Sequence, residues 1–396
     1  MSQLLAWLGF FLGIAAILIV SRKNLAVSMF LGAFILGIFT LPLDKIAEAL
    51  YSVFTDPSTV LLALVVALIP IIGGTLKTSG QMDDLINNLR IGKKAFLAVS
   101  PALIGMLPMP GGALLSAPLV EKGGKGISNE KKVGLNVWFR HVLYLVYPLS
   151  PSLIVAAKVA ELDIFQVIPY LALLLLFSLF LGYFFFLRDT LGKIDYREKF
   201  SLKKLLPPLT VIFVAPILDF LLKDLVSPEE VATLIGVATS LVLAMATGRI
   251  WVRKMYHITK ESKPWNFALM IVGIMTFLHV FEISGIPELI AGVEVTPEIL
   301  SVVIGFLLGF GTGRIVTPAG VIIPIFFTKF GPISPIIFAI TYFSIFLGYV
   351  LTPVHPCVSL TAEFFKVEIK DFLKVTAPPA LIAFIVCFLL LFIINT

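Results

Sequence analysis

The stretch Tyr147-Pro-Leu-Ser-Pro151 recurs later in the chain as Tyr349-Val-Leu-Thr-Pro353. In both places eight residues follow, and then comes an Ala-Glu pair, at 160–161 and at 362–363. Each motif lies in an apolar run, where a proline leaves the carbonyl four residues earlier without its usual helical donor. The chain therefore carries two matching broken helices, separated by a constant offset of 202 residues.

Two further pairs of segments repeat in the same order. The segments 79–86 and 284–290 share Ser-Gly followed by Leu-Ile. The Pro-Gly-Gly at 110–112 stands where Pro-Ala-Gly stands at 318–320. Self-similarity of this kind indicates an internal repeat.

The composition excludes a soluble enzyme. The 396 residues are 59% hydrophobic and 14% charged, with a mean hydropathy of +1.03. Soluble domains are about 45–50% apolar and about 25% charged. The net charge of +6 comes from basic residues in short loops, a pattern of membrane topology rather than of nucleic-acid binding.

We predict an all-α polytopic membrane protein of about ten transmembrane helices and two re-entrant hairpins. A bilayer core of about 30 Å needs roughly 20 apolar residues per helix. The predicted spans are 3–20, 25–41, 58–76, 131–150, 164–187, 205–222, 230–248, 264–281, 332–352 and 372–395. The predicted hairpins are 95–120 and 299–328, both interrupted by Pro and Gly.

These spans divide into two repeats of inverted topology. The N-terminal repeat, 1–190, and the C-terminal repeat, 205–396, each hold three spans, a hairpin and two spans. A basic cytoplasmic linker at 191–204 joins them. Five crossings are an odd number, so the second repeat inserts upside down, and such repeats are typical of secondary transporters.

The basic residues set the orientation. With both termini outside, the inward segments hold 25 of the 30 Lys and Arg residues, in agreement with the positive-inside rule. We expect a multi-pass protein of the cytoplasmic (inner) membrane of a prokaryote.

Broken helices within the membrane suit ion and substrate binding. Freed carbonyls favour Na⁺, and helix N-termini with free N–H groups favour an anion. We assign substrate binding to the hairpin tips, at Pro110, Gly111, Gly112, Gly313, Arg314, Thr317 and Pro318. We assign ion coupling to Ser150, Pro151, Thr352, Pro353, Glu161, Glu363 and His355. Possible Na⁺ is the one cofactor or metal expected.

Structural interpretations stand beside these assignments. The prolines and glycines could be mere kinks, and the hydroxyls could bond their own backbone. Arg314 could pair with Glu161 or another outward carboxylate. Glu161 and Glu363 could form i,i+3 pairs with Lys158 and Lys366, and His355 could be a packed neutral histidine.

The paired hairpins and [Ser/Thr]-Pro breaks resemble the ion transporter superfamily, which includes citrate, dicarboxylate, gluconate and arsenite permeases. The string PMPGGALLSAP at 108–118 is most similar to its uncharacterised integral-membrane branch, family 401 of the domains of unknown function. The resemblance implies a mobile transport domain made of the hairpins with spans four, five, nine and ten. It also implies a scaffold, a homodimer and elevator-type alternating access.

The sequence thus predicts a secondary active transporter for a small anion, a carboxylate by preference, coupled to Na⁺ or H⁺. The first alternative is a Na⁺/H⁺ antiporter without organic substrate, which would use Glu161, Glu363 or His355. The second is a membrane enzyme or assembly factor, but no phosphate loop, nucleophile elbow or metal-ligand spacing favours an enzyme. The expected partners are the small anion, Na⁺ or H⁺ and the lipid bilayer, with no nucleic acid.

Overall fold

A computed structural model describes residues 3–21, 23–106, 112–194, 196 and 199–395. Its described residues contain helices and loops but no strand. The fold class predicted from the composition, an all-α polytopic membrane protein, is confirmed.

Ten helices form the first half of the chain. They are α1 (Gln3–Val20), α2 (Leu25–Thr40), α3 (Leu43–Thr55), α4 (Pro57–Thr78), α5 (Gln81–Asn87), α6 (Lys93–Met106), α7 (Gly112–Gly123), α8 (Asn129–Val142), α9 (Pro151–Val159) and α10 (Ile164–Gly182). A short 3₁₀ turn at Leu143–Leu145 prolongs α8, and a π-helical turn at Tyr183–Leu187 prolongs α10.

The described residues of the second half form ten more helices, in a similar succession of long and short segments. They are α11 (Leu202–Leu222), α12 (Glu230–Gly248), α13 (Val252–Ser262), α14 (Pro264–Ile283), α15 (Ile286–Ala291), α16 (Gly305–Thr312), α17 (Val316–Phe330), α18 (Pro335–Leu351), α19 (Pro356–Phe365) and α20 (Ile369–Asn395). A π-helical segment at Ile299–Ile304 leads into α16. Each predicted hairpin is a pair of helices, α6–α7 and α16–α17.

Local signals explain where the main helices begin. Asp56 accepts hydrogen bonds from the backbone N–H and the hydroxyl of Thr59, which caps α4. Proline occupies the first turn of α4, α9, α14, α18 and α19, where its missing N–H costs no helical hydrogen bond.

Eight of the described helical segments are long and apolar enough to cross a membrane. The other two predicted spans correspond to α2, which has 16 residues, and to α8, which carries several charged residues. The window from α18 into α19 is 83% buried, so this segment is the centre of the bundle.

Six of the described helices were not predicted from the sequence, namely α3, α5, α9, α13, α15 and α19, and α3 and α13 are the longest of them. In α3, the buried residues Ile46, Ala49 and Val53 lie on one face, and in α13 the buried Ile258 packs near Ile71 of α4. Both helices are amphipathic, so they lack the long apolar run by which spans were recognised. They occupy equivalent places in the two halves, each after the second long helix.

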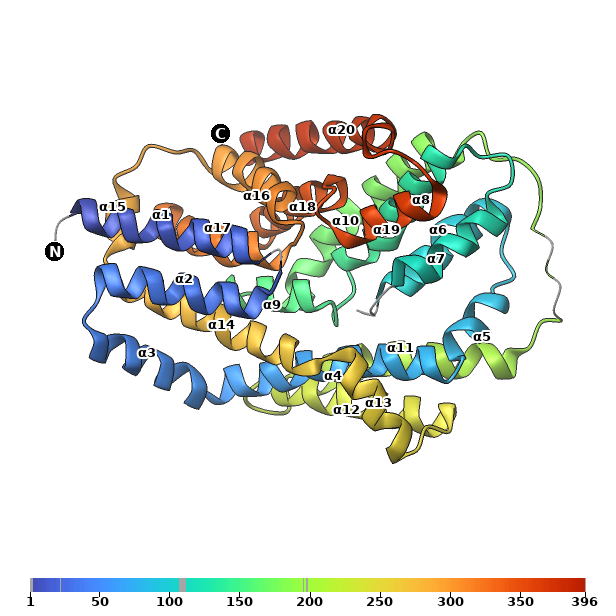
Figure 1. Ribbon diagram of the computed structural model, residues 1–396, viewed down its shortest axis with the longest axis horizontal. Coiled ribbons are helices and arrows are strands. Elements are labelled where there is room, and N and C mark those ends of the chain that lie inside the picture. The colour runs from blue at the N-terminus through green and yellow to red at the C-terminus, as the bar shows by residue number, and fades with distance from the viewer. Residues whose placement is uncertain (1–2, 22, 107–111, 195, 197–198, 396) are drawn as a thin grey trace.

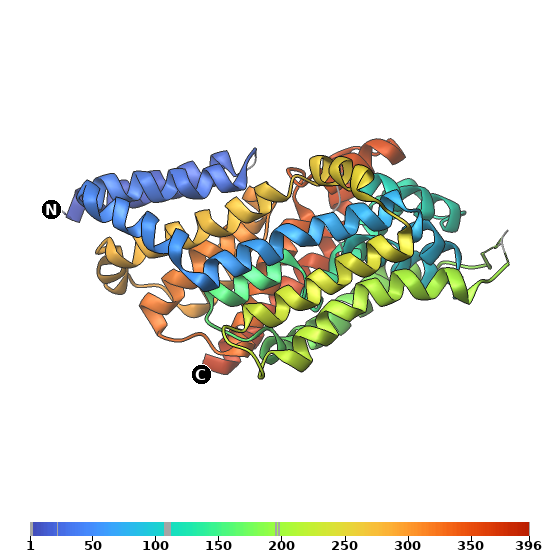
Figure 2. The ribbon, with the colours of Figure 1, turned by 90° about the horizontal axis from the view of Figure 1, so that it is seen from below.

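The helices pack in two groups (Figure 1). In the first group α1, α2, α14, α4, α12 and α11 follow one another as packed neighbours, and α4 lies beside α12 in Figure 2. In the second group the two hairpins pack on α8 and α18, which also contact α19, α10 and α20. The second group therefore contains the segments that the resemblance assigned to a transport domain.

Candidate functional site

The helix breaks converge within the second group of helices. The α6–α7 hairpin packs on α8, the α16–α17 hairpin packs on α18, and α19 contacts both α7 and α8 (Figure 1). The first break lies between Leu145 and Pro151, and the second lies between Leu351 and Pro356. Helix ends from both halves of the chain thus meet in one buried region.

Arg140 of α8 is the charged centre of this region. Only 3% of the residue is exposed, and its Nη1 donates to the carbonyl oxygen of Gly112 (2.9 Å) and to Ser116 Oγ (3.4 Å). Its Nε is buried without a hydrogen-bond partner. No carboxylate among the described residues forms an ion pair with it. A buried cation without a counter-ion is energetically unfavourable.

Glycine at position 112 makes room for this arginine. A Cβ atom on Gly112 would lie 2.1 Å from Arg140 Nη2. A Cβ atom on Gly105 of α6 would lie 1.7 Å from the Arg140 carbonyl oxygen. The absence of both side chains brings the first hairpin directly against α8.

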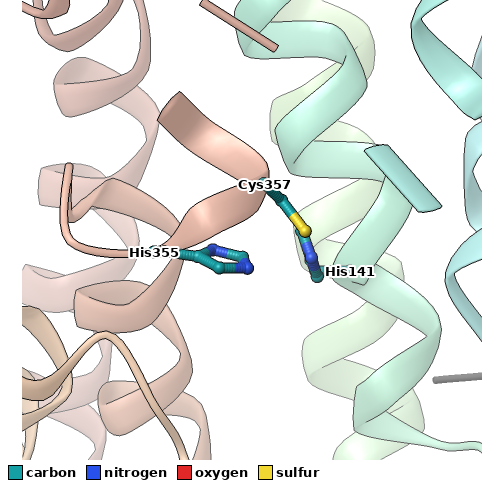
Figure 3. A group of neighbouring side chains, drawn as sticks. All are labelled: His141, His355 and Cys357. Atoms are coloured by element: carbon teal, nitrogen blue, oxygen red, sulfur yellow. The ribbon is translucent and has the colours of Figure 1, made fainter. Parts of the chain in front are cut away.

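Two histidines lie beside Arg140. His141 and His355 are both buried, and their ring centroids are 4.7 Å apart (Figure 3). His355 also stacks on Tyr349, with ring centroids 4.1 Å apart. Helices α8 and α19, which belong to different halves, thus share one cluster of rings.

The second hairpin brings Arg314 close to the same cluster. Gly313 adopts φ 63°, a left-handed conformation that favours glycine, and a Cβ atom there would lie 3.1 Å from the backbone nitrogen of His355. Arg314 is half-buried, and its Nε donates to the Ser21 carbonyl oxygen (2.7 Å). It interacts electrostatically with Tyr349 and His355. The alternative ion pair with Glu161 is absent from the described residues.

The paired hydroxyls before the prolines have different surroundings. Ser150 Oγ is buried without a hydrogen-bond partner, whereas Thr352 Oγ1 accepts a hydrogen bond from the Val354 N–H (3.2 Å). Pro151 begins α9, but Pro353 precedes the start of α19 by three residues. The repeat thus preserves the two breaks and alters their local geometry.

The remaining tip residues are only partly described. Thr317 and Pro318 are buried in the first turn of α17, and Thr317 Oγ1 makes no hydrogen bond. Gly112 is the first residue of α7. Pro110 and Gly111 lie outside the described residues.

The structure does not bring Glu161 and Glu363 into the buried cluster. Both are exposed, at the ends of α9 and α19. Their suggested i,i+3 pairs are also absent from the described residues, because Lys158 binds Glu230 Oε1 (2.7 Å) instead of Glu161. Lys366 adopts φ 55° at the end of α19.

Glu161 lines a large cavity. Its volume is about 1150 Å³, and α9, α10, α11, α12, α14 and α17 contribute to its walls. Charged residues line it, namely Lys158, Glu161, Asp163, Asp219, Lys223, Glu229, Glu230 and Glu282. Helices of both groups therefore line the cavity.

Sequence reasoning did not assign Arg140 and His141 to the site. The available signal was an Arg-His pair two turns inside a predicted span, where ionisable residues are costly and commonly functional. Asn136 also belongs to this polar side of α8, because its Nδ2 donates to Thr361 Oγ1 (3.0 Å). No local pattern could show that α19 would lie opposite.

These features define a polytopic, all-helical membrane protein with a buried polar site between broken helices. The chain belongs to the family described as "Protein of unknown function (DUF401)", whose profile matches residues 4–394. The fold is similar to the crystal structure of the YdaH transporter of Alcanivorax borkumensis. The TM-score is 0.65 and the identity 14%, over 88% of this chain and 87% of that chain. No protein of curated function matches this sequence.

Proposed function

We propose that this protein is a secondary active transporter for a small carboxylate anion, driven by Na⁺ or H⁺. The observation that carries the proposal is Arg140, which is buried beside the first hairpin with an unpartnered Nε and no described counter-ion. Arg314 would supply a second positive charge from the other hairpin. A carboxylate would accept charge-assisted hydrogen bonds from both guanidinium groups, which are stronger than hydrogen bonds between neutral groups.

The coupling ion would bind at the helix breaks. Ser150 Oγ is buried without a hydrogen-bond partner. Pro151 interrupts the backbone hydrogen bonding beside Ser150, and Pro353 does the same beside Thr352. Hydroxyl and carbonyl oxygens are suitable ligands for Na⁺. In H⁺ coupling, His355 beside the second break would carry the proton while the bound anion offsets the positive charges of Arg140 and Arg314, which otherwise oppose protonation of the ring. Glu161 and Glu363 would act only as entry groups for cations at the protein surface.

Alternating access would follow from movement of the second group of helices against the first, as in an elevator. The helix order repeats between the halves, which supports two inverted repeats. Ion pairs also cross the boundary between the groups: Lys158 of α9 binds Glu230 of α12, and Asp163 binds Lys223. These pairs are partly buried but line the cavity, so their charges would be rehydrated when the two groups move apart. The first group would form the scaffold of a homodimer.

The test is the thermal stability of the purified protein with a panel of small carboxylates and oxyanions, with and without Na⁺. A specific ligand binds the folded state and raises the melting temperature by mass action. We expect a Na⁺- or pH-dependent shift with one anion class. We expect Arg140→Gln and Arg314→Gln to abolish the shift, and the control Arg249→Gln, at the end of α12, to retain it.

Two results would contradict the proposal. An anion response that survives both substitutions would remove these arginines from the site. A response to Na⁺ or pH alone, with no anion in the panel active, would favour the Na⁺/H⁺ antiporter.

A further inference from the structure

Three metal-binding side chains meet at the contact between α8 and α19. One ring nitrogen of His141, one of His355 and the Sγ atom of Cys357 all lie within 4.8 Å of one another. Figure 3 shows Cys357 and His355, both from the start of α19, opposite His141 of α8. The two histidines are buried and Cys357 is half-buried, so the thiol lies on the accessible side of the cluster.

Each histidine has one buried ring nitrogen without a hydrogen-bond partner. His141 Nδ1 lies 2.7 Å from the Val137 carbonyl oxygen, to which it donates in the neutral ring, and Nε2 is buried without a partner. His355 Nδ1 is also buried without a partner. A histidine held by a carbonyl through one nitrogen presents the lone pair of the other to a metal. His141 therefore has the arrangement of a metal ligand, and His355 offers an unpartnered nitrogen beside it.

The spacing agrees with a small three-coordinate site. An ion equidistant from three atoms separated by 4.8 Å would lie about 2.8 Å from each, against about 2.0–2.3 Å for bonds to nitrogen and sulfur. Closing that gap needs each ligand atom to move by about 0.5–0.8 Å, which small rotations of the three side chains supply.

The surrounding charge selects the ion. Arg140 and Arg314 both act electrostatically on His355, so a site that gains a large positive charge is disfavoured. A divalent ion with one thiolate and two neutral imidazoles leaves a net charge of about +1, whereas Cu⁺ with the same ligands is neutral. Thiolate and imidazole are also ligands that bind Cu⁺ well.

We propose that His141, His355 and Cys357 bind one Cu⁺ ion and so join the two halves of the chain at α8 and α19. The thiol loses its proton to solvent when the ion binds, and the copper does not change oxidation state. The site shares His355 with the proposed proton route but contains neither of the arginines that would bind the anion, so copper binding and anion binding can be tested separately.

The test is anaerobic titration of the full-length protein with Cu⁺ against bicinchoninate, a coloured competing chelator. We expect one tightly bound equivalent. Cys357→Ser should lose at least tenfold in affinity, because the thiolate is removed. The matched control is Cys387→Ser, which replaces the other cysteine, buried in α20, and should bind as the native protein does.

X-ray absorption of the native protein provides a second measurement that does not depend on the variants folding. The expected spectrum has one sulfur and two nitrogen neighbours around Cu⁺. Failure to bind one equivalent, a spectrum without sulfur, or unchanged binding by Cys357→Ser would each overturn the proposal. The anion-induced melting shift of Cys357→Ser separates the two ideas: we expect it to persist, whatever becomes of copper binding.

Discussion

Gly112→Ala tests whether the position of Arg140, and not only its charge, creates the anion site. The new Cβ atom would lie 2.1 Å from Arg140 Nη2, whereas ordinary contacts begin at 3.4 Å. The guanidinium group or the hairpin must therefore move by about 1.3 Å. Such a shift disrupts the 2.9 Å hydrogen bond from Nη1 to the Gly112 carbonyl oxygen and misplaces the remaining donors.

The expected loss follows from the hydrogen bonds of a charged group. One such bond contributes about 1.5–3 kcal/mol, so a misplaced guanidinium should weaken anion binding by about 10- to 150-fold. The net charge of the protein is unchanged, which separates geometry from long-range attraction. Isothermal titration or the dependence of the melting temperature on anion concentration measures the dissociation constant.

The matched control is Gly311→Ala in the second hairpin. A Cβ atom on Gly311 meets no atom within 4 Å, and alanine is favoured over glycine in a helix by about 1 kcal/mol. This variant should bind the anion normally. Equal affinity of the Gly112→Ala variant and the native protein would refute the reasoning, because Arg140 would then not depend on its place against the hairpin.

Gly105→Ala should lower the melting temperature measured by differential scanning fluorimetry. The new Cβ atom would lie 1.7 Å from the Arg140 carbonyl oxygen, and overpacking of this kind costs about 1–3 kcal/mol. An unchanged melting temperature would contradict the close packing of α6 on α8. Glu230→Gln weakens the ion pair with Lys158, so it should speed exchange between the two access states. The measurement is the rate at which cysteines introduced in the cavity are labelled, which should rise. Slower labelling would count against a boundary between moving groups. Burial opposes ionisation of Asp56, but its hydrogen bonds to Thr59 outweigh this and hold its pKa below the usual value. Its capping contribution is therefore complete above the ordinary pKa and lost as pH falls through the lowered value, so Asp56→Asn should reduce the stability difference between pH 6 and about pH 3. An identical pH profile for the native protein and this variant would rule out the cap as its source.

The sequence allowed most of the fold to be predicted because the strongest signals are local. Long apolar runs specify spans, and prolines with glycines specify where they break, so both hairpins and both breaks were located within a few residues. This reasoning did not predict helices α3 and α13. Their apolar residues lie on one face only, and a search for continuous apolar runs does not detect such helices.

The site was harder to predict because it depends on contacts between distant segments. Arg140 and His355 are 215 positions apart, and only packing of α19 on α8 brings their surroundings together. Matching sequence spacing gave Glu161 and Glu363 equivalent places in the two halves. The spacing of residues along the chain does not determine how deeply they are buried in the folded protein. Both carboxylates lie at exposed helix ends.

The polar character of α8 has a consequence for biosynthesis. This helix carries Lys131, Lys132, Arg140 and His141, so it does not partition into lipid by itself during insertion. In the folded protein, α8 packs against α18, α19 and α20, which the ribosome synthesises some 200 residues later. The nascent first half must therefore keep α8 beside α6, α7 and α10, or within the insertion machinery, until the C-terminal helices arrive. Completion of the membrane-embedded protein is thus tied to synthesis of its last helices.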